Sequence, residues 1–125
     1  MNLLLDTHIF LWWLADDKRL TKKIKNLIAQ PENMIFISVI SAWEINIKTA
    51  LGKLEIPDEI EKAILDNGFQ MLLLNFSHTS IANKLPYLHR DPFDHMLIAQ
   101  AKAENFTFVT HDAKLTNYDI NIIFV

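Results

Sequence analysis

Short, continuous apolar runs recur along the chain, separated by segments with a different periodicity. Each run is four residues long and dominated by Leu, Ile, Val, Phe or Met. This pattern is typical of a strand that is buried on both faces. The predicted strands cover residues 2–5, 34–37, 71–74 and 106–109, with a final edge strand at 122–125.

The intervening segments carry apolar residues at helical spacing. Leu20, Ile24, Leu27 and Ile28, for example, form one stripe that ends before Pro31. The predicted helices run from Ile9 to Leu14, from Leu20 to Ile28, from Ile40 to Ala50 with Gly52 as the stop, from Pro57 to Gly68, from a Ser77 cap toward Pro86, and from Asp91-Pro92 to Ala101, with a short helical turn beginning at Thr110-His111-Asp112.

Strands that alternate with helices and are apolar throughout predict a parallel sheet covered on both faces. The chain shows no internal repeat, linker or low-complexity segment. We therefore expect one α/β domain over residues 1–125, with a mostly parallel central sheet of four to five strands flanked by helices.

Composition narrows the class of protein. Of the 125 residues, half are hydrophobic and 22% are charged, which predicts a folded globular chain rather than a disordered one. The absence of cysteine excludes disulfides, thiolate metal sites and a Cys nucleophile, and it suits a reducing cytoplasm. Asp6 interrupts the apolar N-terminus, which argues against a signal peptide. No apolar run is long enough to cross a bilayer, so we expect no membrane association.

Charge and glycine content exclude several kinds of nucleotide-handling protein. A net charge of −3 counts against simple binding of a phosphate backbone, but not against an acidic site that works through metal ions. The two glycines, Gly52 and Gly68, both fall at expected helix ends. Because no glycine-rich turn follows a strand, a P-loop and a dinucleotide-binding fingerprint are both excluded.

Four carboxylates fall near the carboxyl ends of the predicted strands or at the start of the helices beside them. They are Asp6, Glu44, Asp94 and Asp112. In an open parallel sheet, ligands bind beyond this edge. Carboxylates gathered there would repel one another unless cations neutralised them, and oxygen ligands suit Mg²⁺ or Mn²⁺.

Each acid also has a purely structural interpretation. Asp6 could cap the helix that follows it, and Glu44 closes the capping-box pattern Ser41-Ala42-Trp43-Glu44. Asp94 could favour the positive end of a helix dipole, while Asp91 caps the same helix before Pro92. Asp112 could be an ordinary turn residue. Four independent structural explanations at the same sheet edge are together less probable than one shared site.

The motifs that contain these acids resemble those of PIN-domain proteins, in particular VapC-type toxins of bacterial toxin–antitoxin pairs. They are Leu4-Leu5-Asp6-Thr7-His8 with Leu11-Trp12-Trp13, Ser41-Ala42-Trp43-Glu44-Ile45, Asp91-Pro92-Phe93-Asp94-His95-Met96-Leu97-Ile98-Ala99-Gln100-Ala101, and Val109-Thr110-His111-Asp112. They occur in the family's order and span nearly the whole chain.

The resemblance implies Mg²⁺- or Mn²⁺-dependent endoribonuclease activity on an RNA substrate, a cognate antitoxin as partner, and a homodimer. Position by position, the family's acidic quartet matches Asp6, Glu44, Asp94 and Asp112, which are expected to be both catalytic and metal-binding. Thr7 and Thr110 match the hydroxyl residues beside the first and last acids and are candidates for substrate binding.

Other residues near the quartet are candidates for substrate contact. Lys48 and Arg90 each lie close in sequence to a proposed ligand and could meet substrate phosphate. His8, His95 and His111 also neighbour the acids, but their spacing matches no zinc motif, which favours surface or packing roles. The lysine and arginine side chains of residues 18–25 lie opposite the apolar stripe. They could form a solvated helix face, or they could contact RNA or the antitoxin. Of Trp12 and Trp13, we expect one buried and one partly exposed.

Two alternatives from other classes stay open. A metal-dependent phosphatase would use Asp6 as nucleophile, but the usual pattern places a second Asp where His8 stands. A non-enzymatic, receiver-like acidic binding module would need a lone Asp after the third strand, where the sequence has Asn75.

Overall fold

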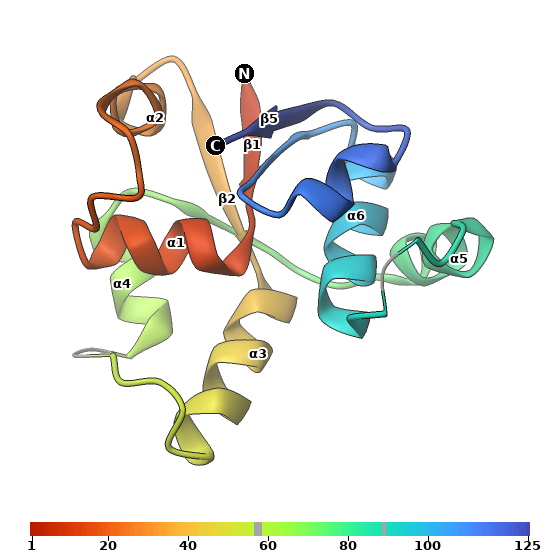
Figure 1. The fold of residues 1–125 in the computed structure, drawn as a ribbon, viewed down its shortest axis with the longest axis horizontal. Coiled ribbons are helices and arrows are strands. Elements are labelled where there is room, and N and C mark those ends of the chain that lie inside the picture. Colours follow the sequence, from red (N-terminus) through yellow and green to blue (C-terminus); the bar gives the residue numbers. More distant parts are fainter. Residues whose placement is uncertain (57–58, 89) are drawn as a thin grey trace.

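The computed structural model describes residues 1–56, 59–88 and 90–125 and shows one five-stranded sheet in which every pair of neighbours is parallel (Figure 1). Its strands are β1 (Asn2–Leu5), β2 (Met34–Ser38), β3 (Gln70–Leu72), β4 (Thr107–Thr110) and β5 (Ile122–Phe124). Their order is β3-β2-β1-β4-β5, so β5 is an edge strand as predicted. The α/β prediction is confirmed.

Helices cover both faces of this sheet. They are α1 (Thr7–Leu14), α2 (Lys22–Ala29), α3 (Val39–Ala50), α4 (Ile60–Asp66), α5 (Phe76–Lys84) and α6 (Pro92–Glu104), and a short 3₁₀ helix, η1 (Ala113–Asn117), follows β4. Figure 1 shows α1, α2 and α4 to one side of the sheet and α5 and α6 to the other. None of the described helices combines the length and apolarity that a membrane crossing requires.

The side-chain alternation of β1 divides the core into two layers. Leu3 and Leu5 pack with the residues of α1, α2 and α4, whereas Leu4 packs with those of α5 and α6. All three leucines are fully buried, as expected for a central strand with helices on both faces. Trp12 is buried and Trp13 partly exposed, which confirms the expected split of the tryptophan pair.

Several predicted boundaries shift. The α5 prediction is wrong in its cap: Asn75 accepts the backbone N–H of His78, and Ser77 lies inside the helix with its hydroxyl bonded to Asn75 Oδ1. Leu73 and Leu74 lie beyond β3, and α1 begins two residues earlier than predicted, directly after Asp6. The predicted helix start at Pro57 lies outside the described residues, within which α4 begins at Ile60.

The sheet order creates a crevice at the carboxyl end of β1. The chain builds outward from β1 to β2 and β3, then crosses to β4 and β5 on the other side, so β1 and β4 flank a topological switch point. Figure 1 shows the first turns of α1, α3 and α6 gathered at this end of β1. The starts of these helices, distant in sequence, therefore lie close to the end of β1.

Candidate active site

A cavity of about 320 Å³ opens at the switch point. We call it the acidic pocket, and its lining residues are Asp6, His8, Trp12, Glu44, Asp91, Asp94, His111 and Asp112. All four acids predicted from the sequence line it. The parallel sheet explains why, since it brings strand ends that are distant in sequence to one edge.

Asp6 is held at both carboxylate oxygens. Its Oδ1 accepts the backbone N–H of Thr7 at 2.7 Å, which caps α1, and its Oδ2 accepts the Thr110 hydroxyl at 2.6 Å. Burial raises the pKa of Asp6, although the bond from Thr110, the charge of His8 and the bond from Thr7 oppose that rise. Asp6 is therefore both a helix cap and a wall of the pocket.

Glu44 lies inside α3 and is almost completely buried. Its capping-box interpretation is wrong, because α3 begins at Val39 and its cap is Ser38. The Thr7 hydroxyl donates to Glu44 Oε1 at 2.8 Å, and Lys48 Nζ lies 2.7 Å from Oε2. The hydrogen bond to Glu44 raises the pKa of Lys48. Lys48 thus lies at the site, in an ion pair.

Asp94 is the most perturbed of the acids. It lies in the first turn of α6, yet burial and then the charges of Asp6, Asp91, Glu44 and Asp112 raise its pKa to about 8. The positive end of a helix dipole would lower that pKa, so desolvation and charge repulsion outweigh the dipole. The first-turn position alone does not explain this residue.

Asp112 and Thr110 complete the pocket on the β4 side. Asp112 caps η1 by accepting the Lys114 N–H at 3.0 Å, and its own N–H donates to the Thr110 hydroxyl oxygen at 3.1 Å. Thr110 therefore links the first and last acids through one hydroxyl. Arg90 is exposed, and it is not among the described residues that line the pocket.

The donor chemistry of the pocket fits a hard divalent cation. The acids supply only oxygen ligands. Burial and the neighbouring carboxylates raise the pKa of Asp94, and a bound cation would offset the repulsion between these charges. Within the described residues, no three His, Asp or Glu side chains are placed to hold one ion together. Mg²⁺ does not require such a cage, since it keeps several waters and takes one or two carboxylates.

The comparisons decide the family. A family model described as the PIN domain matches residues 3–121. The chain belongs to the PIN domain family. The family resemblance read from the motifs is thereby confirmed.

Solved structures share the fold of this PIN domain at low identity. VapBC2 from Rickettsia felis, bound to a DNA fragment from its promoter, matches at 18% identity and a TM-score of 0.70 over 98% of both chains. VapBC-1 from nontypeable Haemophilus influenzae matches at 20% identity and a TM-score of 0.67, over 99% of this chain and 98% of that one. FitAcB from Neisseria gonorrhoeae matches at 19% identity and a TM-score of 0.69, over 97% of this chain and 96% of that one. No curated protein matches the chain.

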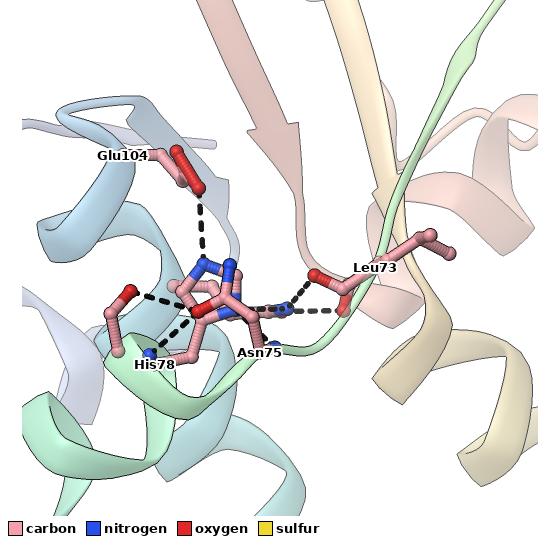
Figure 2. Close-up of polar contacts among 7 residues, drawn as sticks. Leu73, Asn75, His78 and Glu104 are labelled. Carbon is pink, nitrogen blue, oxygen red and sulfur yellow. Dashed lines mark hydrogen bonds and ion pairs between the residues drawn. The ribbon is translucent and has the colours of Figure 1, made fainter.

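A buried polar network fixes α3 against α6 in this PIN domain. The Ser38 hydroxyl accepts the Ile40 N–H at the start of α3 and donates to Gln100 Oε1 on α6. Gln100 Nε2 lies 3.5 Å from the Leu73 carbonyl oxygen and 3.4 Å from His78 Nδ1. Figure 2 shows His78 between Asn75 and Glu104, whose Oε1 lies 3.1 Å from His78 Nε2. The network thus couples the helices that carry Glu44 and Asp94.

Replacing Gln100 with Leu should lower the free energy of unfolding by about 1–3 kcal/mol, because the buried Ser38 hydroxyl would lose its acceptor. Urea denaturation measures the change. Lys102→Ala, an exposed substitution on the same helix, is the control and should change the free energy by less than about 0.5 kcal/mol. Equal unfolding midpoints for Gln100→Leu and Lys102→Ala would contradict this role.

The histidines divide between pocket and core. His8 and His111 are exposed and line the acidic pocket, whereas His95 is buried, with Nε2 2.7 Å from the Ala82 carbonyl oxygen and its ring stacked on Tyr87. The packing role predicted for His95 is confirmed. The other two are available to contact a ligand in the pocket.

Two residues that line the pocket, Asp91 and Trp12, were not predicted as site residues. Asp91 was interpreted only as a cap, which it is, since its Oδ1 accepts the Phe93 N–H at 2.8 Å. It also lines the pocket, as does Trp12. Asp91 lies one turn before Asp94, so helical spacing alone carried a signal for the fifth acid.

Proposed function

We propose that this PIN domain is a Mg²⁺- or Mn²⁺-dependent endoribonuclease that acts as the toxin of a toxin–antitoxin pair. The observation that carries the proposal is the acidic pocket itself, where five carboxylates line one cavity and the pKa of Asp94 is raised to about 8. Strongly perturbed acids in a cleft are characteristic of functional sites.

The carboxylates are assigned roles by their contacts. Asp6 and Asp94 are the proposed direct metal ligands, and Glu44 and Asp112 would complete the acidic quartet by contacting water molecules of the ion. When bound, the ion would supply charge relief at the scissile phosphate and activation of water. Thr7 and Thr110 are buried with their hydroxyls on Glu44 and Asp6, an arrangement that favours positioning of these acids over direct contact with RNA.

Proton acceptance from the attacking water is assigned to Asp112. Both carboxylate oxygens of Glu44 are engaged, by Thr7 and by Lys48. Asp112 is half-buried at the wall of the pocket and lies on a turn beside β4 rather than inside a helix. Hydrolysis in this scheme forms no covalent bond to the protein, and Arg90, exposed just before α6, is the proposed phosphate contact.

The partner proposal draws on the structural relatives. VapBC-5 from Mycobacterium tuberculosis, which shares the fold, is described as a member of the VapBC family of toxin–antitoxin systems, and two of the other structures are VapBC proteins. We propose a cognate antitoxin as the inhibitor of this chain and a homodimer as its own assembly. The phosphatase alternative requires transfer of phosphate to Asp6, whose two carboxylate oxygens already accept hydrogen bonds. The receiver-like alternative requires an Asp after the third strand, where Asn75 instead caps α5.

Incubation of the purified protein with total cellular RNA tests the proposed activity. With Mg²⁺ or Mn²⁺ we expect discrete fragments, and with EDTA none. Because water rather than the 2′-hydroxyl attacks, the new ends should carry no 2′,3′-cyclic phosphate. Cyclic phosphate ends, or stable labelling of the protein by a small phosphate donor, would favour another chemistry.

Replacing Thr110 with Val should lower the cleavage rate by about 10- to 100-fold, the usual effect of removing a group that orients a metal ligand. The hydroxyl bond lowers the pKa of Asp6, so its loss should also move the rate profile toward higher pH. The measurement is the initial rate from pH 6 to 9. Thr107→Val on the same strand is the matched control, and a Thr110→Val profile that coincides with it would contradict the positioning role.

A further inference from the structure

Aromatic rings line the acidic pocket together with the carboxylates. Trp12 and His111 both line the pocket, and their ring centroids lie 5.1 Å apart at an interplanar angle of 63°. The ring of Phe124 lies nearly parallel to His111, at 5.8 Å and 6°. The contact between His111 Nδ1 and the Val125 carbonyl oxygen holds the imidazole in place. The pocket lining therefore combines carboxylates with aromatic rings, and we call Trp12, His111 and the adjoining Phe124 the aromatic side.

The exposed surface of this aromatic side belongs to His111 and Phe124. Trp12 is only 8% exposed and serves as a packed support beside His111. Phe124 is 52% exposed, a large fraction for an aromatic ring. It also lines a second cavity, of about 500 Å³, between α2 and β5, whose lining includes Lys23. The aromatic surface thus extends from the acidic pocket to a neighbouring groove.

A guanidinium lies at the same edge. Arg19 Cζ lies 4.6 Å from the centroid of the Trp12 ring, and its side chain is 64% exposed. Two contacts to Asp17, at 2.7 and 3.0 Å, fix its orientation. Lys18, Lys22 and Lys23 are exposed nearby in the sequence. In a chain of net charge −3, residues 18–23 hold four cations and no acid, and two of the four, Arg19 and Lys23, lie at or next to the aromatic side.

Rings and cations together match the chemistry of an unpaired nucleotide. Aromatic side chains stack on any base because every base has a π-face, and a guanidinium pairs with phosphate. A base in a duplex is already stacked on both sides, so only single-stranded RNA can present one. A phosphate bound in the acidic pocket through a divalent cation would place the adjoining nucleoside within reach of these rings, which line the same pocket.

We infer that Arg19, His111 and Phe124 form a binding subsite for an unpaired nucleotide of single-stranded RNA beside the cleaved bond. The base stacks on the His111–Phe124 rings, and an adjacent phosphate pairs with Arg19. This subsite rests on the proposed nuclease function and names residues that would hold its substrate. A docked protein segment is the competing occupant, and it would show no dependence on the base.

Two assays on the full chain separate the subsite from the nuclease function. Fluorescence anisotropy of a labelled eight-nucleotide single-stranded RNA, with Ca²⁺ supplying the divalent charge, measures binding. Initial rates with Mg²⁺ measure cleavage. His111→Ala should weaken binding and raise KM about tenfold with little change in kcat, and His111→Phe, which keeps a ring, should restore both. Arg19→Ala should reduce the slope of log affinity against log salt by about 0.7.

The outcomes are distinct. The same sequence as a blunt duplex should bind at least about tenfold more weakly than the single strand, and Lys102→Ala, on exposed α6 surface, should match the wild type. Equal binding of duplex and single strand, an unchanged His111→Ala protein, or a His111→Phe protein as weak as His111→Ala would overturn the subsite. Absence of cleavage by the wild type would instead contradict the nuclease proposal, while the anisotropy series would still test the subsite.

Discussion

Asp94→Asn should reduce RNA cleavage by at least about 10²-fold while leaving the fold intact. The substitution keeps the size of the side chain and removes one charge from the carboxylates that line the pocket. Burial and repulsion penalise that charge in the folded protein, as the raised pKa shows. Its removal should therefore leave the melting temperature in metal-free buffer equal to or above that of the wild type at pH 8.

The control for this variant is Asp66→Asn, on exposed α4 surface, where the partner Lys62 contributes an ion pair of little energetic weight. We expect wild-type cleavage from it. The two measurements are initial cleavage rate and thermal unfolding. Full activity of Asp94→Asn would remove the acid from the mechanism, and a large fall in melting temperature would reassign it to a structural role.

Metal binding should release about one proton at pH 7, and the affinity should rise about tenfold per pH unit until pH 8. The pKa of Asp94 is about 8 in the folded protein against an ordinary value of 3.8, so the metal-free folded chain holds one more proton than the unfolded chain between these values. Its free energy of unfolding therefore falls as pH rises from about 4 to about 8. Mg²⁺ displaces that proton, and its stabilising effect grows over the same range.

Calorimetric titration with Mg²⁺ in two buffers of different ionisation enthalpy counts the released protons. Melting temperatures at pH 6 and pH 8, with and without Mg²⁺, measure the stabilisation. Asp94→Asn is the control and should bind metal weakly with no proton release. A pH-independent affinity in the wild type would contradict the coupling of Asp94 to the ion.

The fold and the acidic quartet were predictable because both follow from patterns within short segments. Apolar runs marked the strands, and the parallel arrangement then required that residues following different strands share one edge. Asp6 and Asp112 come soon after β1 and β4, so the parallel arrangement alone predicted that they lie at the same edge of the sheet. The sequence motifs added Glu44 and Asp94, which sit on helices rather than at strand ends.

Features that depend on contacts between distant segments were not predictable. The start of α3 at Val39 placed Glu44 in the helix interior, because Ser38 caps the helix and bonds to Gln100, 62 residues away. The aromatic wall needed the pairing of β4 with β5, which brings Phe124 beside His111. The place of Asp91 in the pocket lining was not predicted, because its role as the cap of α6 already explained an acid at that position.

We propose that divalent metal bound in the acidic pocket is responsible for cleavage of RNA. Mn²⁺ titration of the same sample, followed in parallel by electron paramagnetic resonance and by cleavage rate, tests it most directly. We predict that bound Mn²⁺ and rate rise with one midpoint in the wild type, and that Asp94→Asn loses both. Cleavage that persists in EDTA, or Mn²⁺ that binds equally well to Asp94→Asn, would contradict the account.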